Sequence, residues 1–146
     1  SKVSADRFVR DKEIRIPANE PWTPTGVFID YDDTVTIKAT GKICFRTGRK
    51  ESCVGPGGMG KSDYERSWRA EANACSDPFA GSGHGALIGK VEDFGYFPFA
   101  VAGSKSFTGQ KGSLHLGIND CAFTGDSSNT GEFEVTITID RGQVAK

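Results

Sequence analysis

Apolar and polar residues alternate over several segments of the chain. In GEFEVTITID, residues 131–140, Phe133, Val135, Ile137 and Ile139 fall on one face, while glutamates and threonines fall on the other. A period of two residues is the repeat of a β-strand with one face in a core and one in solvent. This segment is the clearest predicted strand.

Further segments have the same alternation, or the length and apolar content of a strand. They are residues 13–18, 27–30, 33–41, 86–92, 96–103 and 112–120. Pro98 lacks a backbone donor, so we expect its segment at a sheet edge or as an irregular strand. Turns rich in Gly, Asn, Asp and Pro separate the segments without crossover helices. The sequence therefore predicts an all-β fold, an antiparallel, jelly-roll-like β-sandwich of about seven or eight strands.

One segment departs from this pattern. In SDYERSWRAEANA, residues 62–74, Tyr64, Trp68 and Ala72 recur every fourth residue. The spacing fits a helix, and at this length it fits a long ordered loop equally well.

Length and charge exclude several classes of protein. The 146 residues predict one domain over 1–146, with residues 1–11 as a loosely ordered N-terminal segment. Lys and Arg number 18 against 19 Asp and Glu, with no basic block, so we expect no nucleic-acid partner. No apolar run reaches the roughly 18 residues of a bilayer span, so we expect no membrane insertion. A start at Ser-Lys without Met indicates a processed domain or part of a longer chain.

Four cysteines, Cys44, Cys53, Cys75 and Cys121, form no C-x-x-C pair, which argues against a zinc ribbon or a thioredoxin-type site. Two disulfides in a secreted or periplasmic protein are the expectation, and four buried thiols are the alternative. If bridged, Cys44 with Cys53 would close a local hairpin and leave Cys75 with Cys121. The pairing stays open at this point.

GPGGMGKS, residues 55–62, matches the phosphate-loop pattern G-x-x-x-x-G-K-[ST]. Such a loop binds phosphate only between a buried parallel strand and a helix, where backbone N–H groups converge. Here the preceding residues are polar and the surrounding pattern is antiparallel. We interpret the match as a Gly-rich surface loop without a nucleotide.

The segment 119–133 concentrates oxygen-bearing side chains between two predicted strands. They are Asn119, Asp120, Thr124, Asp126, Ser127, Ser128, Asn129 and Thr130. Calcium takes about six to eight oxygen ligands in flexible geometry, which this composition suits. The alternative is a polar turn whose side chains bond their own backbone.

From Trp22 onward the chain resembles the PA-IL-like family of galactose-binding bacterial lectins and carbohydrate-binding modules. The segments that carry the resemblance are WTPTGVFIDYDDTVTIKATGKI, GPGG, GALIGKV, PF with a following G, GSLHLGIND and NTGEFEVTI. The resemblance implies a small β-sandwich with one calcium ion at its tip, to which two adjacent sugar hydroxyls coordinate. It also makes GPGG a turn of the family's middle loops.

The resemblance implies a ligand set, position by position. Asp120 of the IND motif matches the carboxylate ligand, and Thr124 matches a backbone-carbonyl ligand. Asn129 matches the second residue of the [DN]-N-[ST]-G signature. Phe45 stands where the family commonly has a Tyr whose backbone carbonyl binds calcium. Asp120 and Asn129 are also implied sugar contacts.

This chain departs from the family pattern in two places. Ser128, a weaker and uncharged ligand, occupies the first position of the [DN]-N pair, and the loop between Asp120 and Asn129 is longer. Either Asp126 restores the lost carboxylate or the site is degenerate.

Two further residues are candidates for sugar contact. The Trp68 ring would pack on a sugar face, and the His84 imidazole would bond a hydroxyl. The alternatives are packing of Trp68 under the long loop and a turn role for His84. We expect His115, between Leu114 and Leu116, to be a plain surface residue.

The sequence as a whole predicts calcium-dependent carbohydrate binding, on galactose-type residues, by a non-catalytic domain of a larger chain or a homo-oligomer. The alternative is a structural or protein-interaction sandwich with a degenerate metal site. A hydrolase is a third hypothesis, but no carboxylate spacing selects an acid and base pair for it.

Overall fold

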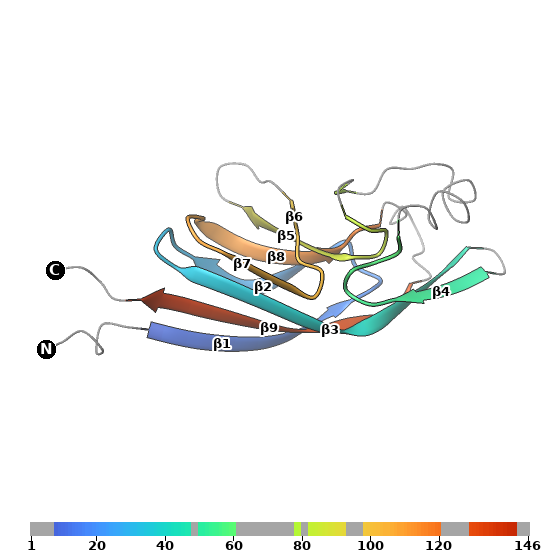
Figure 1. The fold of residues 1–146 in the computed structure, drawn as a ribbon, viewed down its shortest axis with the longest axis horizontal. Helices are drawn as coiled ribbons and strands as arrows, with labels where there is room; N and C mark the ends of the chain where they lie inside the picture. Colours follow the sequence, from blue (N-terminus) through green and yellow to red (C-terminus); the bar gives the residue numbers. More distant parts are fainter. Residues whose placement is uncertain are drawn as a thin grey trace, which may run out of the picture.

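The computed structural model describes residues 8–47, 50–60, 78–79, 82–92, 98–120 and 129–142. Within them the regular secondary structure is entirely β (Figure 1). The strands are β1 (Phe8–Pro17), β2 (Trp22–Ile29), β3 (Thr34–Thr47), β4 (Lys50–Val54), β5 (Leu87–Glu92), β6 (Phe99–Ala100), β7 (Ser104–Phe107), β8 (Gly112–Ile118) and β9 (Thr130–Gly142). No helix among the described residues has the length and apolar character needed to cross a membrane.

The strands form two antiparallel sheets that pack face to face, so the predicted β-sandwich is confirmed. The larger sheet has the order β1-β9-β3-β4, with β7 also paired to β3, and the smaller has the order β2-β8-β5-β6. The sequence pattern did not single out β4 and β7, which are short and mostly polar. Pro98 directly precedes β6. As expected for this segment, β6 lies at a sheet edge, and it is only two residues long.

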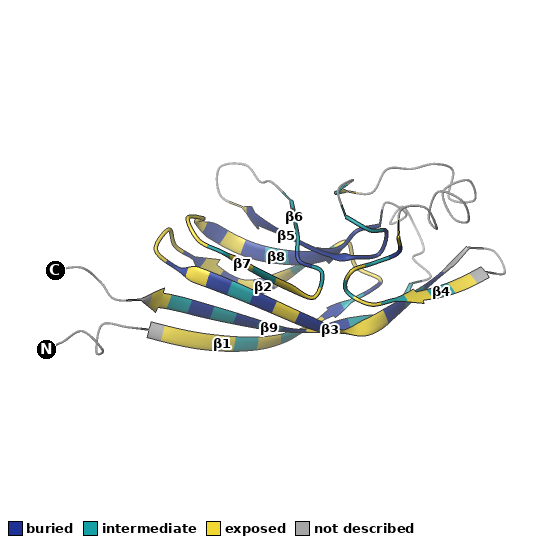
Figure 2. Ribbon diagram, in the orientation of Figure 1, coloured by how far each residue is buried: buried dark blue, intermediate teal, exposed yellow. Residues whose placement is uncertain are grey.

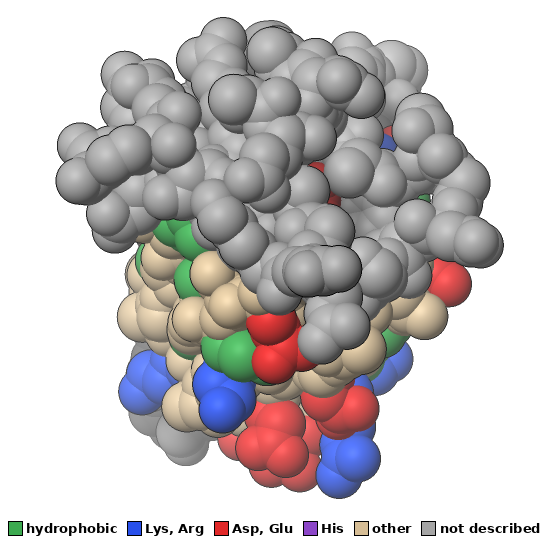
Figure 3. Space-filling view, turned by 90° about the vertical axis from the view of Figure 1, so that its right-hand side faces the viewer, with side chains coloured by type: hydrophobic (Ala, Val, Ile, Leu, Met, Phe, Trp, Pro, Cys, Tyr) green, Lys and Arg blue, Asp and Glu red, His purple; other side chains and the backbone are tan. Residues whose placement is uncertain are grey.

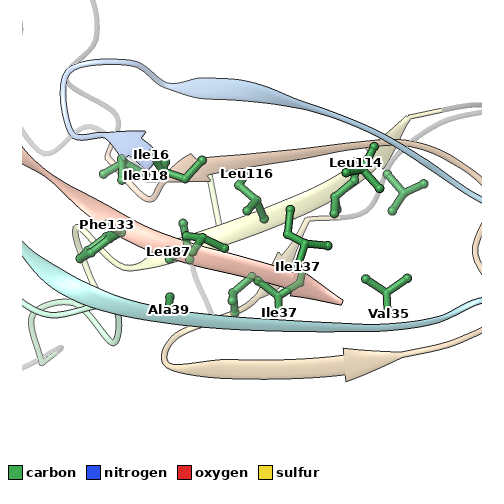
Figure 4. Packing of buried hydrophobic residues seen from close by; sticks show 14 of the residues in the cluster. Ile16, Val35, Ile37, Ala39, Leu87, Leu114, Leu116, Ile118, Phe133 and Ile137 are labelled. Carbon is green, nitrogen blue, oxygen red and sulfur yellow. The ribbon is translucent and has the colours of Figure 1, made fainter. Parts of the chain in front are cut away.

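The core lies between the sheets and consists of the residues predicted from alternation. Along β8, and along β3 and β9 except at the exposed Gly41 and Gly131, every second residue is buried, and the colours of Figure 2 alternate accordingly. Figure 4 shows side chains of both sheets pointing toward one another, among them Phe133, Leu116 and Ile37. All three are fully buried. Burial of each such side chain contributes roughly 1.5–3 kcal/mol to the free energy of unfolding, so this layer is the main stabilising feature.

Strand β1 corrects one expectation. It begins at Phe8, so residues 8–11 lie in a strand rather than in a loosely ordered segment. The reason is the length of β9, whose ladder with β1 extends as far as Gly142. The rest of the N-terminal segment, and the candidate helix at 62–74, lie outside the described residues.

One disulfide joins Cys44 and Cys53, which are directly opposite each other on β3 and β4. It confirms the local bridge, while Cys75 and Cys121 lie outside the described residues. The GPGG segment follows β4, which pairs antiparallel with β3. This is not the parallel strand that a phosphate loop requires.

A partly buried ion pair lies at the end of the sandwich where β2 turns into β3. The Asp33 side chain is fully buried, and Arg141 near the end of β9 donates from Nε to its Oδ1 at 2.7 Å and from Nη2 to its Oδ2 at 3.2 Å. The backbone N–H of Asp30 also donates to Oδ2 at 2.8 Å. The hydrogen bond from Arg141 holds the pKa of Asp33 below its usual value. The pair ties the last strand to the β2–β3 turn.

Asp33→Asn should lower the free energy of unfolding at neutral pH by roughly 1.5–3 kcal/mol, because it weakens the charge-assisted hydrogen bonds between Arg141 and residue 33. A carboxyl whose folded-state pKa is lowered stabilises the fold above its ordinary pKa, and that contribution is lost as the pH falls through the lowered value. The difference between the native chain and the variant should therefore disappear in acid. Urea unfolding at neutral and acidic pH measures it. Exposed Asp32→Asn is the control, and an equal loss there would contradict the prediction.

Candidate functional site

The candidate site lies at the tip of the sandwich where β8 ends, β9 begins and β3 runs into the β4 hairpin. The β3–β9 ladder ends with Cys44 opposite Thr130, so its next step brings Phe45 to the level of Asn129. On the neighbouring sheet β8 ends at Ile118, and Asp120 follows two residues later. Residues from three distant parts of the chain therefore converge at this tip.

Asp120 and Asn129 meet directly. Asn129 donates from Nδ2 to Asp120 Oδ2 at 2.8 Å and to the backbone carbonyl of Ala18 at 3.2 Å. The Asp120 residue is only 5% exposed. Two residues that the resemblance implied as ligands are thus brought together, and the amide also anchors the connection between β1 and β2.

Asn119 organises the loop beside this pair. Its residue is fully buried, its Oδ1 accepts from the Phe79 N–H at 2.9 Å, and its Nδ2 donates to the carbonyls of Phe79, Ser82 and Gly83 at 2.8–3.2 Å. Its own carbonyl accepts from Gly85 at 2.8 Å. The sequence analysis included Asn119 among the oxygen-bearing side chains suited to a metal, but in the structure this side chain binds the backbone of Phe79, Ser82 and Gly83.

The GPGG turn supports the same loop from the other side. Gly58 N–H donates to the Gly55 carbonyl, and Met59 N–H then donates to the His84 carbonyl at 2.7 Å. Gly58 has a φ of +75°, and a Cβ there would lie 2.7 Å from the backbone nitrogen of Ala86. Glycine is needed here for close approach between two backbone segments, which gives the segment a structural role.

His84 is buried at 7% exposure, with its ring edge-on to that of Phe45 at a centroid distance of 4.8 Å. This packing favours the structural role of His84 over sugar contact. Phe45 is itself 4% exposed, and its side chain packs with Met59 and Val54. The ring fixes the end of β3, whose backbone the resemblance implied as a ligand.

The described donors at the tip are the Asp120 carboxylate, the Asn129 amide and backbone carbonyls. Within the described ranges no three His, Cys, Asp or Glu side chains gather as a metal-binding group. The other predicted ligands, Thr124, Asp126 and Ser128, and the predicted sugar contact Trp68, lie outside the described residues.

The sequence analysis did not identify a second polar cluster, because it assigned His115 to the surface without relating it to residues of the neighbouring strand. It lies on the outer face of the smaller sheet, where Glu92 contacts Lys90 Nζ at 2.9 Å and His115 Nε2 at 3.5 Å. The Lys90 ammonium also lies 4.4 Å from the centroid of the Trp22 ring. Lys90 lowers the pKa of Glu92 by its hydrogen bond and charge. His115 is therefore partly buried in a charged cluster. It pairs with Lys90 across β5 and β8, and Glu92 lies two residues further along the same face of β5. The i, i+2 spacing of Lys90 and Glu92 in a predicted strand was the available signal.

No protein-family model matches the chain, and no curated protein matches it in sequence. Among solved structures it is similar to the N-terminal domain of EclA, described as a PllA-like lectin. The identity is 19%, the TM-score is 0.58, and the match covers 93% of this chain and 99% of that chain. The two chains share a fold. At this identity the likeness carries no further conclusion about the site.

Asn119→Ala should lower the free energy of unfolding by roughly 2–3 kcal/mol, because it removes a fully buried amide whose four hydrogen bonds tie Phe79, Ser82 and Gly83 to the end of β8. Thermal or urea unfolding measures the loss. Asn19→Ala, at an exposed turn, is the matched control and should change stability by less than about 0.5 kcal/mol. Similar stabilities for the two variants would show that Asn119 does not hold this loop.

Proposed function

We propose that this domain binds carbohydrate through a calcium ion held at the tip by Asp120 and Asn129. The observation that carries the proposal is the convergence of these two residues, whose side chains lie 2.8 Å apart at the ends of strands from different sheets. The likeness to a domain described as a lectin supports the same conclusion at the level of the fold.

The donor chemistry of the tip fits a hard cation. Asp120 supplies a carboxylate with little exposure to water, Asn129 supplies an amide oxygen, and β3 supplies backbone carbonyls near Phe45. Calcium accepts this mixture of carboxylate, amide and carbonyl oxygens, and when bound it can exchange waters for two adjacent sugar hydroxyls. Thr124, Asp126 and Ser128 are the proposed remaining ligands.

The chain's own residues would orient the site before any ligand arrives. Asn129 Nδ2 fixes the rotamer of Asp120, so coordination by Asn129 would use the Oδ1 of the same amide. Asn119 holds Phe79, Ser82 and Gly83 beside the tip, and Met59, which follows the GPGG turn, donates to the His84 carbonyl. Such preorganisation reduces the entropy that a weak ligand must overcome.

We propose galactose-type residues as the ligand, on the strength of the sequence resemblance, and binding without catalysis. Glycoside hydrolysis uses two carboxyl groups that flank one bond, and the described part of the tip contributes Asp120. We further propose a secreted or periplasmic location, which the Cys44–Cys53 disulfide supports.

Isothermal titration of chelator-treated protein with calcium tests the metal step. Asp120→Asn keeps the size of the side chain and an acceptor for Asn129, but it removes the charge, so calcium affinity should fall at least about tenfold. Asp32→Asn, exposed at the opposite end of the sandwich, should bind calcium as the native chain does.

Titration with galactose, with and without calcium, tests the sugar step. Heat that appears only in the presence of calcium, and is absent in Asp120→Asn, is the expected result. If the native chain takes up no calcium, the proposal is wrong. The Asp120 carboxylate would then have a structural role, in which it accepts from Asn129, as in an interaction sandwich with a degenerate site.

A further inference from the structure

The outer face of the larger sheet contains a hollow of about 410 Å³, away from the tip. It lies over β1, β9 and β3, and two successive rungs of paired residues line it. Glu13, Thr136 and Lys38 form one rung, and Arg15, Glu134 and Thr40 form the next. Its volume is within the range of roughly 300–1,000 Å³ that is common for ligand sites.

The hollow arises from the sizes of its side chains. Thr136 on the central strand and Thr40 on β3 are short, while Glu13 and Arg15 on β1, Lys38 on β3 and Glu134 on β9 are longer. The side chains of Ile14 and Val135 pack toward the core, so these two residues contribute backbone. The result is an open groove that crosses three strands, about 10 Å wide at the usual strand spacing.

The charged groups at this groove are mixed in sign and largely unpaired. Arg15 Nε lies 3.2 Å from a carboxylate oxygen of Glu132, which is two residues from Glu134 on β9 and outside the groove. Among the described residues no hydrogen bond or ion pair engages the side chains of Glu13, Lys38 or Glu134, whose backbones pair within the sheet. Figure 3, which looks onto the tip, shows acidic and basic side chains side by side on the lower part of the molecule, where this sheet lies.

Two carboxylates and two cations sum to zero charge, which limits the class of ligand. A polyanion would meet the glutamates and a polycation would meet Arg15 and Lys38, so both would face repulsion. A sugar hydroxyl both donates and accepts, so adjacent hydroxyls can bond a carboxylate and an ammonium at once. The threonine hydroxyls between them can do the same.

We propose that this groove is a second, low-affinity site for a neutral oligosaccharide. Its polar groups are exposed, Arg15 at 73% of its side chain, so each bond replaces a bond to water and contributes little. Glu134 is four residues from Thr130, about 13 Å along β9 from the tip. A glycan chain that contacts both places would gain avidity from two weak sites.

The inference extends the proposed carbohydrate binding, and the test separates the two. Backbone amide resonances are followed by NMR while galactotetraose is added to the chelator-treated native chain, in which the calcium-dependent site is inactive. Saturable shifts at Thr40 and Thr136, with millimolar affinity, are the expected result. Tetragalacturonate, the anionic counterpart, should shift these amides less at the same concentration.

The double variant Lys38→Gln with Glu134→Gln should weaken galactotetraose binding at least about threefold. Lys42→Gln with Glu20→Gln removes the same charges at exposed positions outside the groove and should bind as the native chain does. The absence of saturable shifts at the groove would overturn the proposal, as would equal binding by the two double variants or stronger binding of tetragalacturonate. Galactotetraose shifts confined to the tip of the calcium-loaded protein would refute the groove and leave the tip site intact.

Discussion

The antiparallel pairing of β9 with β3 determines both the composition of the core and the arrangement of the candidate site. The ladder runs from Thr34 opposite Asp140 to Cys44 opposite Thr130, and it decides which side chains enter the core. A slip of one residue would move Phe133 and every second residue after it to the solvent face. The same register sets Asn129 at the level of Phe45, so the core and the candidate site depend on one set of backbone hydrogen bonds.

Because that register follows from alternation, the sequence predicted the sandwich and its inward residues on β3, β8 and β9. The family resemblance, rather than the alternation, implied that Asp120 and Asn129 belong to one site, and the fold brings the two side chains together. The hairpin partner β4 and the short β7 were not predicted, because their mostly polar sequences contain little periodic signal. Their pairing to β3 is a consequence of the tertiary fold.

The contacts that could not be predicted from the sequence are hydrogen bonds between polar residues far apart in the chain. Asn119 bonds residues 36 to 40 positions earlier, and Arg141 reaches Asp33 across 108 positions. Nothing in their neighbouring residues distinguishes these side chains from exposed ones. His84 was ambiguous for a related reason, since its burial depends on the Phe45 ring, which comes from another strand. Local pattern can identify the residue types available at a tip, but tertiary packing decides which of them stay accessible.

Asn129 shows how closely binding and folding are joined at this tip. Its amide donates to Asp120 after β8 and to Ala18 after β1, so one side chain links three segments of the sandwich. Removing it would loosen the fold and the ligand set together, and a loss of binding in that variant would have two explanations. Asp120 is different, because an amide in its place keeps an acceptor oxygen for Asn129 while it removes the negative charge that a cation requires. The charge of Asp120 is therefore the property through which metal binding can be separated from the architecture that supports it.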